Sequence, residues 1–217
     1  MALILGLIFL AMGLPQQAAS LGRVEGVVVD AANKPVKSAS VYADNLNLPI
    51  RGRRPTVLTD DQGKFVLEDV YPGSLLIRAY KDADMYADMF QFGMPHTWPQ
   101  VELKAGEVFK GVVVRFDKKA GSLQLHTLDA ITDEPIKGIE IQMCHADHVG
   151  DRMYCMTGSV RGDYQLFVPS GVPISINVSA PNHKEWRYQD ASKKPYIVLA
   201  SAEERTLTIN LQPVDSK

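Results

Sequence analysis

Short runs in which apolar and polar residues alternate follow one another along most of this chain. The clearest runs are residues 39–43, 75–79, 174–178 and 207–211. A period of two places one face of a strand on a core and the other in water, as in antiparallel sheets. Turn-forming residues separate the runs, at positions 32–35, 60–63, 71–73 and 169–171. The pattern therefore predicts an all-β chain of short strands, with at most one helical turn within residues 81–90.

The second half of the sequence repeats the first. Residues 35–41 match 135–141 at an offset of 100, and residues 63–67 match 162–166 at an offset of 99. Three later matches, at an offset of 96, pair Leu103, Glu107 and Val113 with Leu199, Glu203 and Ile209. An offset that shrinks in order indicates two copies that diverged through small loop deletions. The short polar link at 117–121 separates them.

Each copy holds about seven short strands in roughly 95 residues, which favours a β-sandwich. We therefore predict two tandem seven-stranded antiparallel Greek-key β-sandwiches, one over residues 21–117 and a divergent one over 118–217. The chain has 217 residues, of which 46% are hydrophobic, so each half is able to bury a core of its own. The formal net charge of −2 gives no electrostatic reason to expect nucleic acid as a partner.

The first twenty residues have the composition of a leader. Residues 1–14 carry no charged side chain and are rich in Leu and Ile, and small residues follow at 18–20. This order predicts a signal peptide cleaved after Ser20, and hence a secreted or periplasmic protein. An uncleaved membrane anchor is the alternative, although roughly 14 apolar residues fall short of the ~20 that span a bilayer. No later segment is apolar enough to cross a membrane.

Several motifs of the first copy resemble the carboxypeptidase regulatory-like (transthyretin-like) domain family. The segments that carry the resemblance are residues 22–30, 33–36, 39–41, 59–67, 70–73, 103–107 and 111–114. The second copy, about residues 121–212, resembles a divergent member of the same family. The resemblance implies a β-sandwich scaffold and no reaction.

The turn and strand at 60–67 show why such a scaffold needs these residue types. Gly63 follows two aspartates and is able to take the positive φ that closes a hairpin. We expect Phe65 and Leu67 to point into the core, and Lys64 and Val66 to face the other way.

Catalytic motifs are missing from the sequence. Zinc catalysis needs three protein ligands, usually two of them close in sequence, and no His-x-x-Glu pair occurs among the five histidines. The chain also lacks a Gly-x-Ser-x-Gly elbow and a phosphate-binding glycine loop. We therefore predict no enzyme activity, no catalytic residue and no cofactor.

The segment around residues 143–156 is the richest in reactive side chains. Cys144 and Cys155 are the only cysteines, and in an exported protein such a pair predicts a disulfide across a hairpin. A copper or zinc site is the alternative, with His145, His148 and Met143 as ligands, because soft sulfur and imidazole ligands favour these metals.

A second candidate site is the insert at residues 82–100, which carries four aromatic residues. These are Tyr86, Phe90, Phe92 and Trp98. Exposed aromatic side chains in a sandwich loop bind a protein partner or stack on sugar rings. A loop folded back over its own sandwich is the other interpretation.

Together these features favour an exported, non-catalytic binding or structural module that acts through protein–protein interaction. Its partner is then a protein or an envelope polysaccharide, and not nucleic acid. Carbohydrate binding at the aromatic insert and periplasmic copper or zinc binding at the Cys/His/Met cluster are the two alternative functions.

Overall fold

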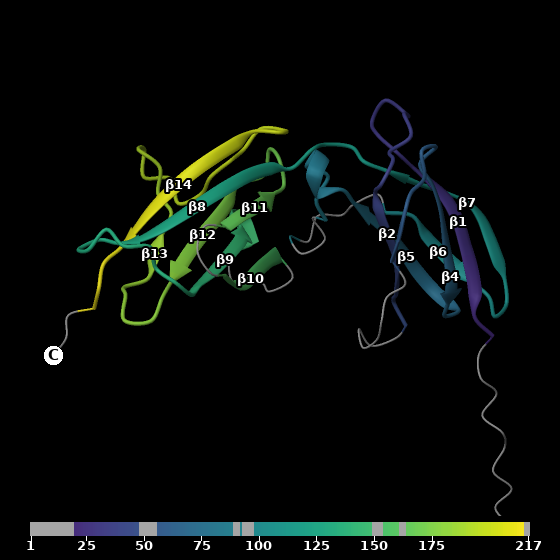
Figure 1. Cartoon of the computed structure of the whole chain (residues 1–217), viewed down its shortest axis with the longest axis horizontal. Helices are drawn as coiled ribbons and strands as arrows, with labels where there is room; N and C mark the ends of the chain where they lie inside the picture. The colour runs from purple at the N-terminus through teal and green to yellow at the C-terminus, as the bar shows by residue number, and fades with distance from the viewer. Residues whose placement is uncertain are drawn as a thin grey trace, which may run out of the picture.

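The computed structural model describes residues 20–47, 56–88, 92, 98–148, 154–160 and 164–214. These residues form an all-β structure of several sheets, as the alternation predicts (Figure 1). The predicted signal peptide lies outside the described residues, apart from Ser20. Within the described ranges, no helix has the length and apolar character needed to cross a membrane.

The described residues of the first half form seven strands in two sheets. They are β1 (Gly22–Val29), β2 (Ser40–Asn45), β3 (Thr56–Leu58), β4 (Lys64–Val70), β5 (Gly73–Tyr80), β6 (Gln100–Leu103) and β7 (Val108–Arg115). One sheet has the order β4-β1-β7 and the other β3-β2-β5-β6. A short 3-10 helix, η1 (Asp82–Asp84), follows β5 where the sequence predicts a helical turn.

The part of the second half that the structure describes also forms seven strands in two sheets. They are β8 (Gly121–Asp129), β9 (Ile139–His145), β10 (Cys155–Val160), β11 (Tyr164–Val168), β12 (Ile174–Ser179), β13 (Trp186–Arg187) and β14 (Glu204–Leu211). Their sheets are β11-β8-β14 and β10-β9-β12-β13, and the 3-10 helix η3 (Ala146–His148) follows β9. The pairing order of the first half is thus repeated strand for strand.

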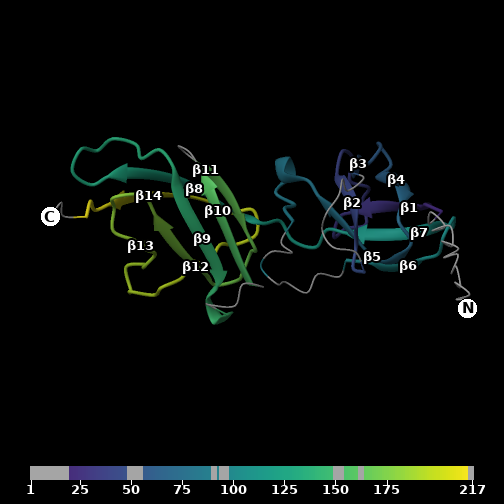
Figure 2. The same cartoon turned by 90° about the horizontal axis from the view of Figure 1, so that it is seen from below.

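Two separate clusters of buried side chains hold the sheets together. One gathers apolar residues between Val24 and Phe116, and the other gathers residues between Ala120 and Leu211 together with Phe92. The change from one cluster to the other falls at residues 117–119, within the predicted link. Figure 2 shows the two groups of sheets side by side along the long axis.

The turn before β4 forms as the sequence predicts. Gly63 has a φ of +70°, and a Cβ at this position would lie 2.5 Å from the Val28 carbonyl oxygen, so glycine is required there. The Asp60 carboxylate accepts hydrogen bonds from the backbone N–H groups of Gln62 and Lys64, both at 2.8 Å. A side-chain acceptor of this kind stabilises a turn, because it pairs backbone N–H groups that have no partner in a sheet.

The side chains of β4 follow the predicted alternation. Phe65 and Leu67 are 3% and 0% exposed, and Lys64 points to solvent. Their place in the first cluster confirms that this strand lines the core.

Candidate functional site

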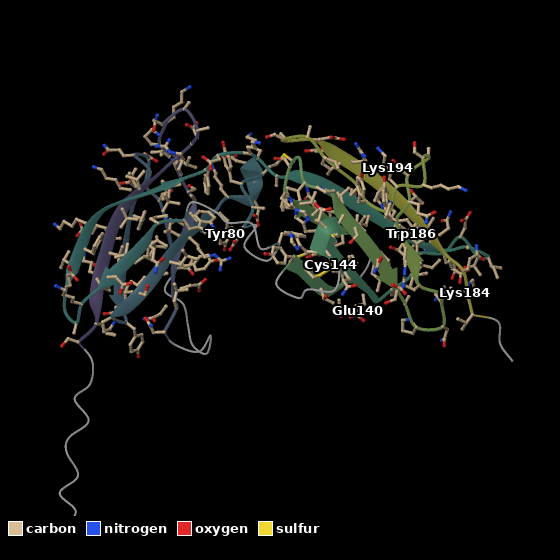
Figure 3. The ribbon with its side chains drawn as sticks, turned by 180° about the vertical axis from the view of Figure 1, so that it is seen from behind. Tyr80, Glu140, Cys144, Lys184, Trp186 and Lys194 are labelled. Carbon is tan, nitrogen blue, oxygen red and sulfur yellow. A yellow bond between two sulfur atoms is a disulfide. The ribbon has the colours of Figure 1, made fainter. Side chains whose placement is uncertain are left out.

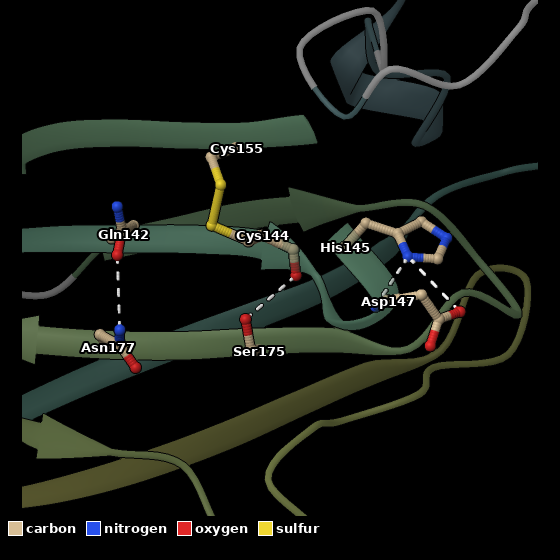
Figure 4. The surroundings of a disulfide bond; sticks show 7 residues. All are labelled: Gln142, Cys144, His145, Asp147, Cys155, Ser175 and Asn177. Atoms are coloured by element: carbon tan, nitrogen blue, oxygen red, sulfur yellow. Dashed lines mark hydrogen bonds and ion pairs between the residues drawn. A yellow bond between two sulfur atoms is a disulfide. The ribbon is translucent and has the colours of Figure 1, made fainter. Parts of the chain in front are cut away.

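The predicted disulfide is present in the structure. Cys144 on β9 and Cys155 on β10 are directly opposite one another in the ladder, and their sulfur atoms are bonded at 2.05 Å (Figure 4). Cys144 lies on the side of β9 opposite the core-facing Met143. The bond fixes β10, an edge strand, to its neighbour at the point where the chain leaves β9.

The proposed metal ligands are only partly brought together. The rings of His145 and His148 lie 5.1 Å apart, and His148 stacks on Tyr154 at 4.1 Å. The side chain of Met143, in contrast, is 0% exposed and belongs to the second core cluster. Since the cysteines are oxidised, the thiolates are not available either. Among the described residues, no three His, Cys, Asp or Glu side chains converge as metal ligands do.

The aromatic residues of the insert do not share one exposed surface. Tyr86 stacks on Phe116 at 4.5 Å with an interplanar angle of 11°, and Trp98 packs half-buried against the first cluster. Phe92 is 2% exposed and belongs to the second cluster, so it is not the surface residue that the sequence suggested. The buried position removes more of the apolar Phe92 ring from water than an exposed position on the insert would, so the ring lies in the core. Phe90 lies outside the described residues.

Sequence reasoning missed a polar hollow on the outer face of the β10-β9-β12-β13 sheet. Its volume is about 180 Å³, and it is lined by Glu140, Gln142, Thr157, Asn177, Ser179 and Glu185. The amide Nδ2 of Asn177 donates to Oε1 of Gln142 at 3.4 Å across β12 and β9 (Figure 4). The hollow therefore offers carboxylates, amides and hydroxyls from β9, β10 and β12 and from Glu185, the residue before β13.

The signal for this hollow was present in the alternation. Glu140 and Gln142 alternate with buried Ile139, Ile141 and Met143 along β9, and Figure 3 shows Glu140 on this sheet. Polar residues on the water side of a strand are usual, so the pattern alone did not distinguish a site from an ordinary surface.

A second feature that the sequence did not reveal lies on the outer face of the β3-β2-β5-β6 sheet. Arg78 on β5 is 5% exposed, forms an ion pair with Asp44 at 2.6 Å, and also pairs with Asp88. The hydroxyl of Tyr42 donates to the same Asp88 carboxylate, and the Arg78 guanidinium lies 5.1 Å from the Tyr42 ring centroid. Burial, together with the hydrogen bond to Asp88, raises the pKa of Tyr42 above its ordinary value. We call these four residues the Arg78 cluster.

Comparisons with known proteins find distant structural likenesses. No family model matches the chain, and no curated protein matches it. The Bacillus anthracis TIE protein is 14% identical over 90% of this chain, with a TM-score of 0.34, and this chain covers 34% of that protein. The minor pilin GBS52 of Streptococcus agalactiae is 11% identical, with 90% of this chain and 98% of that chain covered and a TM-score of 0.36.

A shaft pilin gives a likeness of the same degree. SpaA from Lactobacillus rhamnosus GG is 9% identical, with 92% of this chain and 100% of that chain covered and a TM-score of 0.33. At these identities and TM-scores the likenesses carry no conclusion about this chain, and the function is argued from the site.

Proposed function

We propose that the chain is an exported, non-catalytic module of two tandem β-sandwiches of the carboxypeptidase regulatory-like type. In this proposal the sandwiches span residues 21–117 and 118–217 and follow a leader cleaved after Ser20. The repeated sheet order and the two separate core clusters support the tandem arrangement. The disulfide supports export, because such bonds persist in oxidising compartments.

The module acts by binding a protein partner on the outer face of the β10-β9-β12-β13 sheet. The observation that carries this proposal is the polar hollow, in which hydrogen-bonding side chains of β9, β10 and β12 and of Glu185 gather on a single surface. Glu140 and Glu185 give the hollow acceptors of negative charge, so the partner presents Lys or Arg side chains together with backbone amides. The disulfide beside the hollow holds β10 and β9 in register.

A protein suits this hollow better than an envelope polysaccharide. Proteins that hold sugar rings usually do so with an aromatic side chain beside polar groups, because the ring faces are apolar. The lining of the hollow consists of polar side chains alone. Binding of copper or zinc stays a prediction. Of its proposed ligands, only His145 and His148 lie near each other.

The proposal is tested by placing a photoreactive amino acid at position 142, inside the hollow, and at position 208 as a control. Thr208 is an exposed residue of β14, on a different sheet. With the full-length exported protein, we expect a protein adduct from position 142 and none from position 208.

Competition then shows whether the adduct reflects the hollow itself. Excess wild-type protein should suppress the adduct, whereas the Glu140→Ala/Gln142→Ala variant should suppress it at least tenfold less well. Equal adducts at both positions, or equal competition by the variant, would rule out the hollow as the binding site. Retention on a polysaccharide array that the same variant abolishes would replace the protein partner with a glycan.

A further inference from the structure

A few residues that follow β5 in the first half lie against the second half. The backbone N–H of Ala120 donates to the carbonyl oxygen of Met85 at 2.7 Å. Ala87 packs against the second core cluster, and Phe92 is a buried member of that cluster. We call residues 85–88 together with Phe92 the bridging residues.

The same bridging residues are also fastened to the first half. The ring of Tyr86 stacks on Phe116, the last residue of the first cluster. Asp88 accepts hydrogen bonds from Tyr42 and Arg78 on the outer face of the β3-β2-β5-β6 sheet. In Figures 1 and 2 this sheet lies on the side of the first half that is nearer to the second half.

We infer that the bridging residues form an interface that joins the two halves into one cooperative folding unit. Phe92 is the anchor, because its aromatic ring leaves water only when the second half is folded and docked. The Arg78 cluster is the counterpart in the first half, since it holds Asp88, four residues before Phe92, on a folded sheet.

Tandem domains that are joined by a short link usually move and unfold separately unless a large apolar interface couples them. Here a core residue of one half is contributed by the other half. The unfolding of either half therefore exposes Phe92 or releases the sheet that holds Asp88. This coupling fixes the direction in which the hollow of the second half points relative to the first half, whatever its ligand.

The chain provides a direct readout, because it has two tryptophans and each half contains one. Trp98 packs against the first cluster and Trp186 against the second. The Trp186→Phe and Trp98→Phe backgrounds therefore report each half separately in a urea titration followed by fluorescence. In the full-length exported protein we expect the two unfolding curves to coincide.

Phe92→Ala should separate the two curves, because it removes the anchor. Truncation of a buried Phe changes an unfolding equilibrium constant by about 100-fold or more. The loss of stability should appear in the unfolding curve that Trp186 reports. Two curves that already differ in the wild-type protein, or that stay together and unshifted in Phe92→Ala, would overturn the inference.

Phe167→Ala is the matched control, because Phe167 packs against the second cluster from β11 within the second half. If the halves are coupled, this variant shifts both curves together. A shift of the Trp186 curve alone would show two independent domains of equal stability.

Should Phe92→Ala fail to fold, Asp88→Asn provides the second variant. It weakens the attachment to Arg78 and leaves both core clusters intact. We expect it to separate the curves by less than Phe92→Ala does, and coincident curves in Asp88→Asn would count against the proposed interface.

Discussion

The two halves of the molecule share one strand order and differ in what lies on their outer faces. In the first half β1 lies between β4 and β7, and in the second half β8 lies between β11 and β14. The first four-stranded sheet carries the Arg78 cluster, whereas the second carries the disulfide and the open polar hollow. The comparison shows that the inward positions define the fold and leave the outward positions free to acquire different chemistry.

One pair of core positions shows how the two halves fill the same space differently. In the first half Phe65 lies opposite Gly26, and in the second half Tyr164 lies opposite Leu125. A Cβ on Gly26 would come within 2.6 Å of the Phe65 ring, so the large residue needs the small one. Leu125 is 1% exposed and occupies its own core space, and Tyr164 is 40% exposed.

The different packing at these two positions predicts the largest difference in stability between two matched substitutions. Phe65→Ala should lower the free energy of unfolding by about 3 kcal/mol or more, because it leaves a cavity. Tyr164→Ala should cost less than about 1 kcal/mol, because much of the ring already contacts water. Urea titrations of the two variants measure both values, and equal losses would contradict the proposed exchange of core space.

The second prediction concerns the disulfide, a crosslink that the first half lacks, since both cysteines of the chain lie in the second half. The Cys144→Ala/Cys155→Ala variant should lose about 3 kcal/mol of stability, because the bond restricts the unfolded chain. Reductant should destabilise the wild-type protein by a similar amount and leave the variant unchanged. If reductant also destabilises the variant, the loss of stability in the wild-type protein does not come from the disulfide.

The third prediction uses a polar side chain that stands where the first half has an apolar one. The carbonyl groups of Val28 and Thr127 accept equivalent hydrogen bonds, from the N–H groups of Val36 and Ile136. Thr127 is 4% exposed, and its hydroxyl has no hydrogen-bond partner among the described residues. Burying an unpaired hydroxyl is unfavourable.

Thr127→Val should therefore stabilise the protein by about 1 kcal/mol, and Val28→Thr should destabilise it by about 1–2 kcal/mol. Differential scanning calorimetry of both variants tests the pair. A loss of stability in Thr127→Val would mean that the hydroxyl forms a hydrogen bond in solution.

The smallest predicted effect is a pH dependence confined to the second half. The ring of His183 donates from Nδ1 to the Pro181 carbonyl at 2.8 Å and from Nε2 to the Asp129 carboxylate at 3.0 Å. The Pro181 carbonyl, and next to it the Asp129 carboxylate, raise the pKa of His183. The N–H groups of Thr132 and Ile131, followed by His183, lower the pKa of Asp129 to about 2.

A raised His pKa stabilises the fold fully below the ordinary value of about 6.5, and the effect is lost as pH rises through the folded-state pKa. The lowered Asp129 pKa stabilises the fold above about 3.9 and is lost as pH falls towards 2. Stability should therefore decrease as pH rises above about 6.5, through the raised pKa of His183, and His183→Asn should flatten this decrease. A profile that is the same in both proteins would assign the pH dependence to other groups.

Alternation in the sequence predicted the all-β fold and the inward side chains of β4, and the single pair of cysteines in an exported chain predicted the disulfide. These features depend on neighbours in the sequence or on adjacent strands. The position of Phe92 was not predictable in this way, because its contacts come from the other half of the chain. The Arg78 cluster and the polar hollow were missed for a related reason, since an outward polar residue has the same sequence pattern whether it is solvated, paired or part of a site.

The parallel pairing of the first and last strands gives each half a particular response to force. β1 runs parallel to β7 from Arg23↔Val108 to Val29↔Arg115, and β8 runs parallel to β14 in the same way. The chain therefore enters each half at one end of this ladder and leaves at the other. A pull on the two ends loads the inter-strand hydrogen bonds in shear, so that they break together rather than one after another, and each half resists stretching along the direction in which the chain continues.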